Sequence, residues 1–275
     1  MQRLRQFFLL PAALVMITLF FVPLLIVLVY SFLTRGAYGG VALPFSFESY
    51  RRVFDALYLA IAWRSFWIAA VSAIACLILG FPLALYIARY SRHKTLLLNL
   101  VMLPFWTSFL IRTYAWMFLL RDTGLINTLL QSLRLIEDPL PLLFNTPAVI
   151  LGLVYGYLPF MVLPLYATIE KLDPAWLDAA ADLGANPWVA TLKIVVPLSR
   201  SGIIAGLLLV FIPCLGAYLT PDLMGGGKTV MLGNLVQNQF TASRDWPFGA
   251  AVSLVLLVIV LALTSLISRR AQDLI

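Results

Sequence analysis

Long apolar runs separated by short polar segments dominate the hydrophobic pattern of this chain. Six runs are long enough to cross a hydrocarbon core of about 30 Å as helices, and their expected bounds are 8–32, 63–88, 95–119, 147–168, 201–220 and 248–268. Of the 275 residues, 62% are hydrophobic and 11% are charged, whereas soluble domains carry roughly 25% charged residues. The pattern therefore predicts an all-α polytopic membrane protein with six transmembrane helices.

The positive charges between the apolar runs indicate the orientation of the chain. Lys and Arg favour cytoplasmic loops, and although the overall margin is narrow, the two termini and the loop before residue 95 favour a cytoplasmic N-terminus and C-terminus. The first run exceeds the length of a signal-peptide core, and no small-residue cleavage site closely follows it, so we expect a retained anchor. Without a fixed-period repeat or a low-complexity linker, residues 1–275 are expected to form one transmembrane domain, with a core at about 63–268.

The cytoplasmic loop 169–200 breaks the apolar pattern with small residues, acids, a glycine and prolines. The Asp-Pro pair at 173–174 and the Asn-Pro pair at 186–187 are helix-start signals, while Gly184 suits a helix end and Pro197 interrupts the second segment. The loop is therefore predicted to hold two short helices joined by a sharp turn. Spacing alone leaves two roles open: a knob that docks into a partner's groove, or a helix that rests on the lipid surface.

The chain lacks the groups that hydrolysis within a membrane would need. It has a single histidine, His93, in a basic loop, two cysteines in separate runs, and no Gly-x-Ser-x-Gly sequence. The sequence Gly-Lys-Thr at 227–229 is not a P-loop, because Asp222 stands where that motif needs a glycine. We therefore expect neither an enzyme nor an ATP-binding chain, and no metal site.

The loop 169–200 also carries a recognisable order of residues. Asp178-Ala179-Ala180, three residues, Gly184, nine residues and Ile194-Val195-Val196-Pro197 resemble the EAA loop of ATP-binding-cassette (ABC) importer permeases, whose pattern is Glu-Ala-Ala, three, Gly, nine, Ile-x-Leu-Pro. Asp178 replaces Glu and Val196 replaces Leu, so charge and apolar character are kept at these two positions. The stretches "LPFWTSFLIRTYAW", "GLVYGYLPFMVLPLYATIEKLD", "PDLMGGGK" and "RDWPFGAA" resemble the polyamine (spermidine/putrescine) branch of these importers.

This resemblance implies a permease subunit in a bacterial inner membrane that forms half of a pathway for polyamines delivered by an extracytoplasmic binding protein. It also implies a second permease subunit in a heterodimer, two copies of a cytoplasmic ATPase that bind ATP and Mg, no cofactor in this chain, and no nucleic-acid partner. The coupling site to the ATPase would comprise Asp178, Ala179, Ala180, Gly184, Ile194 and Pro197. Two alternatives stay open: an ABC permease for another small solute, and an ion-driven secondary carrier.

A polyamine is a chain of ammonium groups and methylenes, so its path should offer carboxylates and aromatic faces. The candidates are Asp222, Asp245, Trp106, Tyr114, Tyr155 and Tyr218. The aromatic residues could equally belt the membrane interfaces or pack within the protein. Arg112 lies inside the third run, and because a fixed cation repels a cationic substrate, we expect it to have a structural role, either snorkelling outward or pairing with a carboxylate or helix-end carbonyls.

Overall fold

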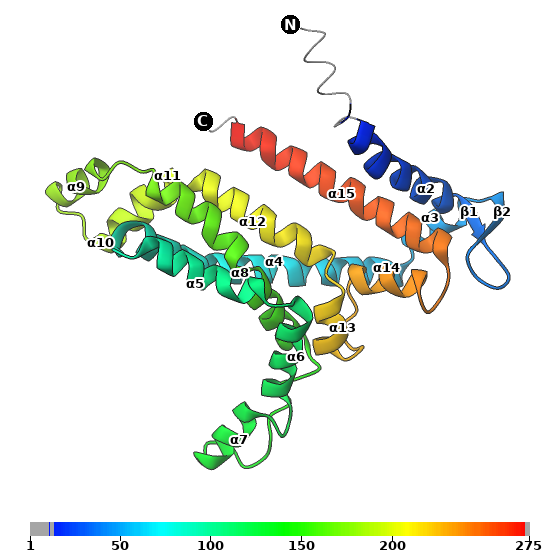
Figure 1. The fold of residues 1–275 in the computed structure, drawn as a ribbon, viewed down its shortest axis with the longest axis horizontal. Helices are drawn as coiled ribbons and strands as arrows, with labels where there is room; N and C mark the ends of the chain where they lie inside the picture. Colours follow the sequence, from blue (N-terminus) through cyan, green and yellow to red (C-terminus); the bar gives the residue numbers. More distant parts are fainter. Residues whose placement is uncertain (1–10, 12–13, 273–275) are drawn as a thin grey trace, which may run out of the picture. The chain divides into compact units, whose positions relative to one another are not determined.

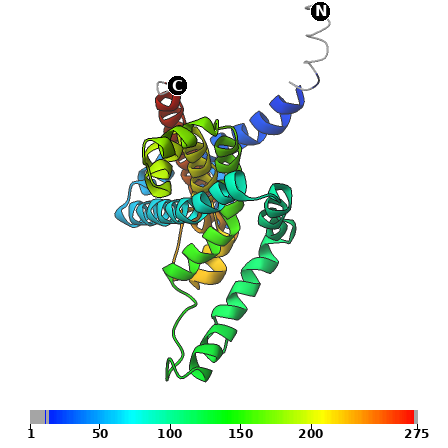
Figure 2. The ribbon, with the colours of Figure 1, turned by 90° about the vertical axis from the view of Figure 1, so that its left-hand side faces the viewer.

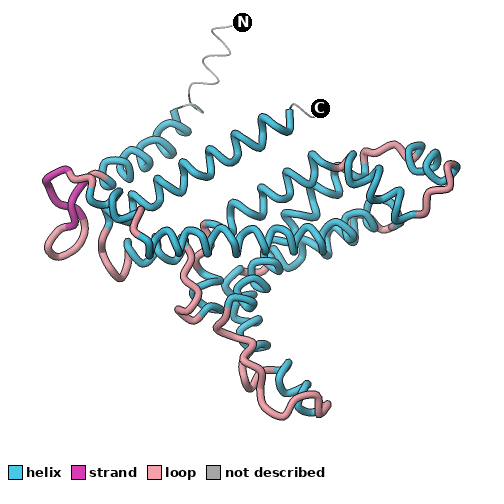
Figure 3. The backbone as a smooth tube through the Cα atoms, turned by 180° about the vertical axis from the view of Figure 1, so that it is seen from behind, coloured by secondary structure: helices cyan, strands magenta, loops and turns pink. Residues whose placement is uncertain are grey.

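The computed structural model describes residue 11 and residues 14–272 of the chain (Figure 1). It forms two compact units, residues 1–61 with 235–262 and residues 62–234 with 263–275. Most of the described residues are helical, and Figure 3 shows one small two-stranded hairpin in magenta. The beginning of the first apolar run, with Arg3 and Arg5, lies outside the described residues.

The first unit joins the N-terminal helix, the hairpin and the start of the last helix. Within it, the Arg35 guanidinium donates a 2.7 Å hydrogen bond to the carbonyl of Ser243, and the Gly40 N–H donates a 2.8 Å bond to the carbonyl of Arg244. These bonds attach the hairpin to the loop before the last helix. The elements up to residue 85 are η1 (Ile17–Phe21), α2 (Val22–Ser31), β1 (Leu33–Arg35), β2 (Val41–Phe45), α3 (Glu48–Val53) and α4 (Ala56–Leu85).

The second unit holds most of the apolar helices. In Figures 1 and 3, α9 and α10 lie at one end of α5, α8 and α12, whereas α6, α7 and α13 lie at the other end. Two helices are shared between the units. Helix α14 begins in the second unit and ends in the first, and helix α15 begins in the first unit and ends in the second. The elements after α4 are η2 (Tyr86–Tyr90), α5 (Lys94–Trp106), α6 (Phe109–Leu120), α7 (Leu125–Ser132), α8 (Thr146–Glu170), α9 (Ala175–Asp182), α10 (Pro187–Ala190), η3 (Thr191–Val195), α11 (Val196–Leu198), α12 (Arg200–Leu215), α13 (Leu219–Gly225), α14 (Leu232–Phe240) and α15 (Trp246–Gln272).

Helices α8 and α12 form the centre of the second unit, and glycines let them approach closely. A Cβ at Gly202 would lie 2.5 Å from Thr168 Oγ1, and a Cβ at Gly206 would lie 2.6 Å from Met161 Sδ. Such pairs of small residues, spaced four apart, allow helix backbones to pack at short distance within a membrane. Both glycines of α12 therefore serve contacts inside this subunit.

The expected spans are confirmed for four runs and corrected for two. Among the described residues, four helices are long and apolar enough to cross a membrane, namely Leu14–Ser31, Ala56–Tyr90, Thr146–Glu170 and Trp246–Ile267. The runs at 95–119 and 201–220 were expected to be continuous, and that expectation is wrong. The structure has two bent helix pairs there, Lys94–Trp106 with Phe109–Ser132 and Pro187–Leu198 with Arg200–Leu215, so six spans result only if each pair counts as one.

The third run breaks at two hydroxyl residues. Thr107 has an extended backbone and its Oγ1 donates a 2.7 Å hydrogen bond to the carbonyl of Pro104, which lies inside α5 and has no N–H of its own. Ser108 is also extended and becomes the N-cap residue of α6. The two helices meet at an angle of 88°, so α6 and α7 run away from α5 in Figure 2.

The fifth run ends earlier than the apolar pattern indicates. Pro213 removes a backbone donor in the last turn of α12, the helix stops at Leu215 and α13 begins at Leu219. Gly233 packs directly against the carbonyl of Ala217 in the connecting segment. At the other end of α12, the preceding helical segment is bent by 72° around Ser199. The fifth span is therefore a short helix between two breaks.

Candidate functional site

The elbow, residues 169–200, has the two capped helices that the sequence predicts. Helix α9 ends in a Schellman motif, in which the N–H of Ala185 bonds to the carbonyl of Ala180 at 2.9 Å and the N–H of Gly184 bonds to that of Ala181 at 2.9 Å. Gly184 takes a left-handed backbone with φ +78°, which costs glycine little because it has no Cβ. The turn between the two helices is therefore a defined structure.

Side chains also fix the starts of both elbow helices. Asp173 Oδ1 accepts a 3.0 Å hydrogen bond from the N–H of Ala175, and Asn186 Oδ1 accepts a 2.8 Å bond from that of Val189. Each bond satisfies a backbone donor that has no partner within the helix. Together with the Schellman motif, these caps make the elbow a shaped projection.

Two polar contacts hold the end of α8, where the elbow begins. The Arg89 guanidinium donates a 2.6 Å hydrogen bond to the carbonyl of Leu172. The Lys94 ammonium lies 3.3 Å from the Glu170 carboxylate, and because both side chains are exposed this pair contributes little energy by itself. Both contacts link the elbow to the segment around η2 and the start of α5, so its position follows that of the membrane helices.

The elbow exposes four large apolar side chains, those of Trp176, Leu183, Trp188 and Leu192. The exposed fraction is 89% for Leu183 and 77% for Trp188. Large apolar side chains exposed on one projecting segment indicate an interaction site. Trp176 lies in α9 and Leu183 at its end, and the sharp turn brings Trp188 and Leu192, which the sequence pattern did not single out, into the same projecting segment.

The predicted coupling residues lie at different depths in the elbow. Asp178 and Ala179 are exposed, whereas Ala180 is 5% exposed and packs inward; Gly184 is exposed, and Ile194 and Pro197 are half-buried. The structure thus places the acid and the glycine on the surface, where a partner could contact them. The role of all six residues in coupling stays a prediction.

The predicted pathway residues of the second unit do not form one cluster. Trp106 at the end of α5 and Tyr114 on α6 are exposed, while Tyr155 packs edge-on against Trp116 at 5.5 Å. Tyr218 and Asp222 lie together at the start of α13, where the N–H of Asp222 bonds to the carbonyl of Tyr218 at 3.0 Å. Their role in a substrate path stays a prediction.

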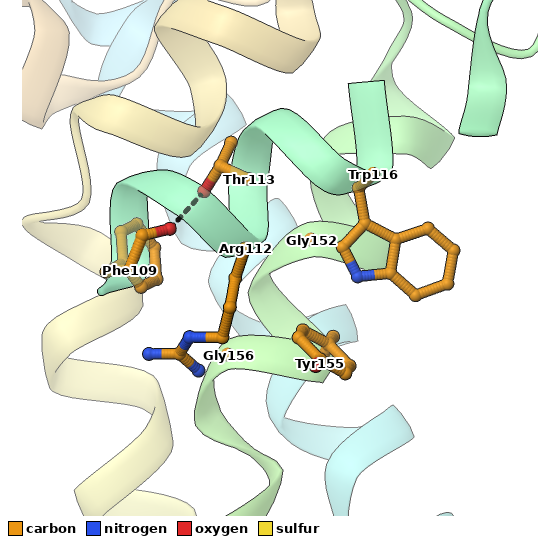
Figure 4. A pocket seen from close by; sticks show the side chains of 7 residues that line it. All are labelled: Phe109, Arg112, Thr113, Trp116, Gly152, Tyr155 and Gly156. Carbon is orange, nitrogen blue, oxygen red and sulfur yellow. Dashed lines mark hydrogen bonds between the residues drawn. The ribbon is translucent and has the colours of Figure 1, made fainter. Parts of the chain in front are cut away.

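Arg112 is buried, with 8% of its surface exposed, so it does not have the outward, snorkelling arrangement that was one expectation. In Figure 4 its side chain points toward Gly156, with Phe109 on one side and Tyr155 on the other. The guanidinium lies 5.4 Å from the centroid of the Phe109 ring and 5.8 Å from that of Phe105. The side chain therefore neither snorkels outward nor pairs with a carboxylate of the described residues.

The ring contacts of Arg112 leave part of its guanidinium unsatisfied. Its Nε and Nη1 atoms are buried and have no hydrogen-bond partner among the described residues. A buried charge without a partner costs several kcal/mol, and a cation–π contact offsets only part of that, about 0.5–2 kcal/mol. Its proposed structural role is consistent with the packing of α6 against α8, and it stays a prediction.

Asp245 has a partner in the first unit. Its Oδ2 accepts a 2.8 Å hydrogen bond from Arg52, and its Oδ1 accepts one of 3.3 Å from the N–H of Phe248, at the start of α15. The Arg52 guanidinium also lies 4.3 Å from the centroid of the Phe248 ring. Burial by itself lowers the pKa of Arg52, but hydrogen bonds and charge from Asp245 and Tyr58 outweigh it and raise that pKa above its ordinary value.

Substitution of Asp245 tests whether this carboxylate is structural. Asp245→Asn keeps an acceptor for the α15 cap but removes the charge, so we expect the free energy of unfolding to fall by about 1–2 kcal/mol, less than for a fully buried pair because Arg52 is partly exposed. Asp245→Ala removes the cap as well and should cost about 1 kcal/mol more. Thermal unfolding of the purified subunit measures both. Unchanged stability with lost solute uptake would instead support a pathway role.

The fold and the elbow define a class of protein: an all-helical, multi-pass membrane subunit with a capped, projecting loop between two of its spans. Residues 77–275 match the family described as "Binding-protein-dependent transport system inner membrane component". The chain belongs to this family. It is therefore a transport subunit of the inner membrane and not an enzyme. Transport systems of this class, the ABC importers, also contain an ATPase and a binding protein.

Individual relatives match most of the chain. It is 43% identical to the spermidine/putrescine transport system permease protein PotB of Haemophilus influenzae over 92% of this chain and 88% of the relative. It is 44% identical to PotB of Escherichia coli (strain K12), with 92% of each chain covered. A crystal structure of a bacterial alginate ABC transporter, in complex with an alginate pentasaccharide-bound periplasmic protein, has a chain with the same fold, with a TM-score of 0.81, 16% identity, and coverage of 98% of this chain and 94% of that one.

Proposed function

We propose that this chain is a permease subunit that carries polyamines, spermidine or putrescine, into the cell in an ATP-driven importer. The observation that carries the proposal is the identity of 43–44% over 92% of the chain with two spermidine/putrescine permeases. The substrate is a flexible cation, and the aromatic side chains near the breaks in the third and fifth spans are suited to such a cargo.

The elbow is the proposed contact with the ATPase. Its exposed apolar side chains and the exposed carboxylate of Asp178 suit a groove on a soluble partner. The caps and the Schellman motif give the projection a fixed shape, so that a push on α9 is passed to α8 and α12, which flank the elbow in sequence. ATP and Mg would be bound by two copies of the ATPase, with no cofactor in this chain.

The rest of the assembly follows from the same proposal. A second permease chain, in a heterodimer, would complete the pathway, and an extracytoplasmic binding protein would deliver the substrate. Residues 1–275 would act as one transmembrane domain with both termini and the elbow on the cytoplasmic side. This orientation is supported by the positive charges of the segment around η2, which lies on the same side of the second unit as the elbow.

Charge reversal at Asp178 tests the contact with the ATPase. Asp178 is exposed in the first turn of α9, so Asp178→Lys should leave the fold of the subunit intact while placing a positive charge against the partner. We expect ATP-dependent uptake of labelled spermidine to fall about tenfold or more, as expected where one charge-assisted contact of about 1.5–3 kcal/mol is lost. Uptake is measured in proteoliposomes that contain both permeases, the ATPase and the binding protein.

Two controls make this experiment specific. Asp178→Glu keeps the charge and should transport at the normal rate, and a neutral solute of similar size should not compete with spermidine for uptake. Normal transport by Asp178→Lys would show that Asp178 is not part of the contact with the ATPase. Failure of the unaltered assembly to take up spermidine or putrescine would contradict the proposed substrate.

A further inference from the structure

A hollow of about 550 Å³ opens in the second unit where the third and fifth spans are broken. Its size falls within the range of roughly 300–1,000 Å³ that is usual for small-molecule sites. The wall combines the start of α6, the middle of α8, the end of α12 and the start of α13. The lining residues used below are Phe109, Tyr157, Pro213, Gly216, Tyr218 and Thr220.

Aromatic rings from three different elements face this hollow. Phe109 comes from α6, Tyr157 from α8 and Tyr218 from the segment before α13. Phe109 and Tyr157 lie near one another, with ring centroids 6.5 Å apart, and Tyr218 is half-exposed. The face of an aromatic ring attracts an ammonium group, and its breadth also suits methylene groups.

The backbone adds negative potential at the same place. Helix α12 has 16 residues and ends at Leu215, so Pro213 and Gly216 put the C-terminal end of this helix at the wall of the hollow. The C-terminal end of a helix carries a partial negative charge that favours cations. Broken helices of transporters use such ends to hold positively charged groups.

A hydroxyl group is also left without a partner in this wall. Thr220 is 1% exposed, and its Oγ1 is buried with no hydrogen-bond partner among the described residues. The side chain packs against α8, where its Cγ2 would lie 2.7 Å from a Cβ at Gly152. Its oxygen therefore lies beneath the surface of the hollow and adds polarity to the wall without being a contact for a ligand.

The charges around the hollow favour a cation at its open side. None of the described residues that line it is charged, and the exposed carboxylate of Asp222 lies one turn beyond Tyr218 on α13. On the other side, Arg112 lies 5.4 Å from the centroid of the Phe109 ring and does not line the hollow. Its positive charge would keep a cation from moving further inward past Phe109.

We propose that this hollow is a transit subsite that holds one ammonium group and the adjacent methylenes of an extended organic cation. The inference rests on the proposed polyamine transport for the identity of the cargo, whereas the cation preference follows from the rings and the helix end. Because no carboxylate lines the wall, the hollow binds the cation weakly. Weak binding is required for transport, since the substrate must leave the subsite again. The rings hold the methylenes, and the C-terminal end of α12 attracts the ammonium group.

Photolabelling locates the site independently of transport. The complete transporter in proteoliposomes is irradiated with an aliphatic diamine that carries a diazirine, and labelled peptides are identified by mass spectrometry. We expect adducts at 109, 157 or 218, and we expect excess spermidine to suppress them while an uncharged diol of the same length does not. Adducts confined to other segments, or equal suppression by the diol, would overturn the proposal.

Variants of Tyr218 then measure the contribution of the ring. Tyr218→Leu should lower the maximal rate of spermidine uptake about 5- to 10-fold, the effect of losing one or more kcal/mol of cation–π attraction. ATP hydrolysis stimulated by the loaded binding protein should persist, because the elbow is unchanged. Tyr218→Phe keeps the ring and should stay within about twofold of the unaltered protein. The matched control is Phe118→Leu, an exposed aromatic of α6 outside the hollow, which should transport normally.

The outcomes separate this subsite from the proposed function. If the unaltered assembly imports spermidine but Tyr218→Leu is as fast and labelling misses the hollow, the subsite is wrong and polyamine transport stands. If the assembly imports no polyamine but the diamine still labels the hollow in a charge-dependent way, the cation subsite stands and the cargo is wrong. Equal losses in Phe118→Leu and Tyr218→Leu would also count against the subsite.

Discussion

Replacing Gly184 with Val should abolish most ATP-dependent uptake while the subunit still inserts into the membrane. Gly184 has φ +78°, and a Cβ at this position would meet no other atom within 4 Å. The cost therefore comes from the backbone conformation, which disfavours a β-branched residue by about 1–2 kcal/mol or more. That cost lowers the ratio of native to altered turn about 5- to 30-fold, and uptake should fall as the altered turn becomes populated.

The comparison with Gly184→Asn makes this experiment decisive. Asparagine tolerates the left-handed region far better than valine does, so Gly184→Asn should retain at least half of the uptake. Uptake and binding-protein-stimulated ATP hydrolysis are measured together, with the amount of subunit in the membrane determined by immunoblot. Equal activity of the Val and Asn variants would show that the shape of the elbow is irrelevant to coupling.

The second large effect is expected at Gly202, where valine should prevent the subunit from folding stably. A Cβ there would lie 2.5 Å from Thr168 Oγ1 and 2.8 Å from the carbonyl oxygen of Pro164. The backbone oxygen cannot rotate away, so α8 and α12 must separate, and overpacking of this kind costs about 1–3 kcal/mol or more. We expect a large loss of folded subunit and a lower midpoint of thermal unfolding.

The neighbouring residue supplies the control for Gly202. Ser201 is exposed on the same helix, so Ser201→Val adds the same side chain without a clash and should fold normally. Adding Thr168→Ala to Gly202→Val removes the shortest of the three close contacts, that with Oγ1, and should restore part of the stability. If Gly202→Val were as stable as Ser201→Val, the close packing of these helices would be wrong.

The sequence predicts this fold well wherever local signals act alone. The Asn-Pro pair at 186–187 predicted a helix start, and Asn186 caps α10 through its side chain. Gly184 was predicted to end α9 in the left-handed conformation, and it does. The apolar run at 147–168 forms one long helix despite Pro159 and Pro164. In each case the residue that determines the structure lies within a few positions of the feature.

The sequence predicts less of the fold where a helix breaks within a continuous apolar run. Thr107 and Ser108 are short interruptions in an apolar run, and the 88° bend there depends on how α6 packs against α8. The sequence did not predict the hollow, because Phe109, Tyr157 and Thr220 come from three elements that only the folded chain brings together. The partner of Asp245 was missed because Arg52 is distant in sequence.

The ion pair between Arg52 and Asp245 affects how hybrid permeases should be assembled. The shared family region begins at residue 77, which leaves Arg52 outside it and Asp245 inside it. A chimera that exchanged only Asp245 and α15 between two relatives would pair Arg52 of one protein with the carboxylate position of the other. In a chimera, the segments that contain Arg52 and Asp245 should therefore be taken from the same protein.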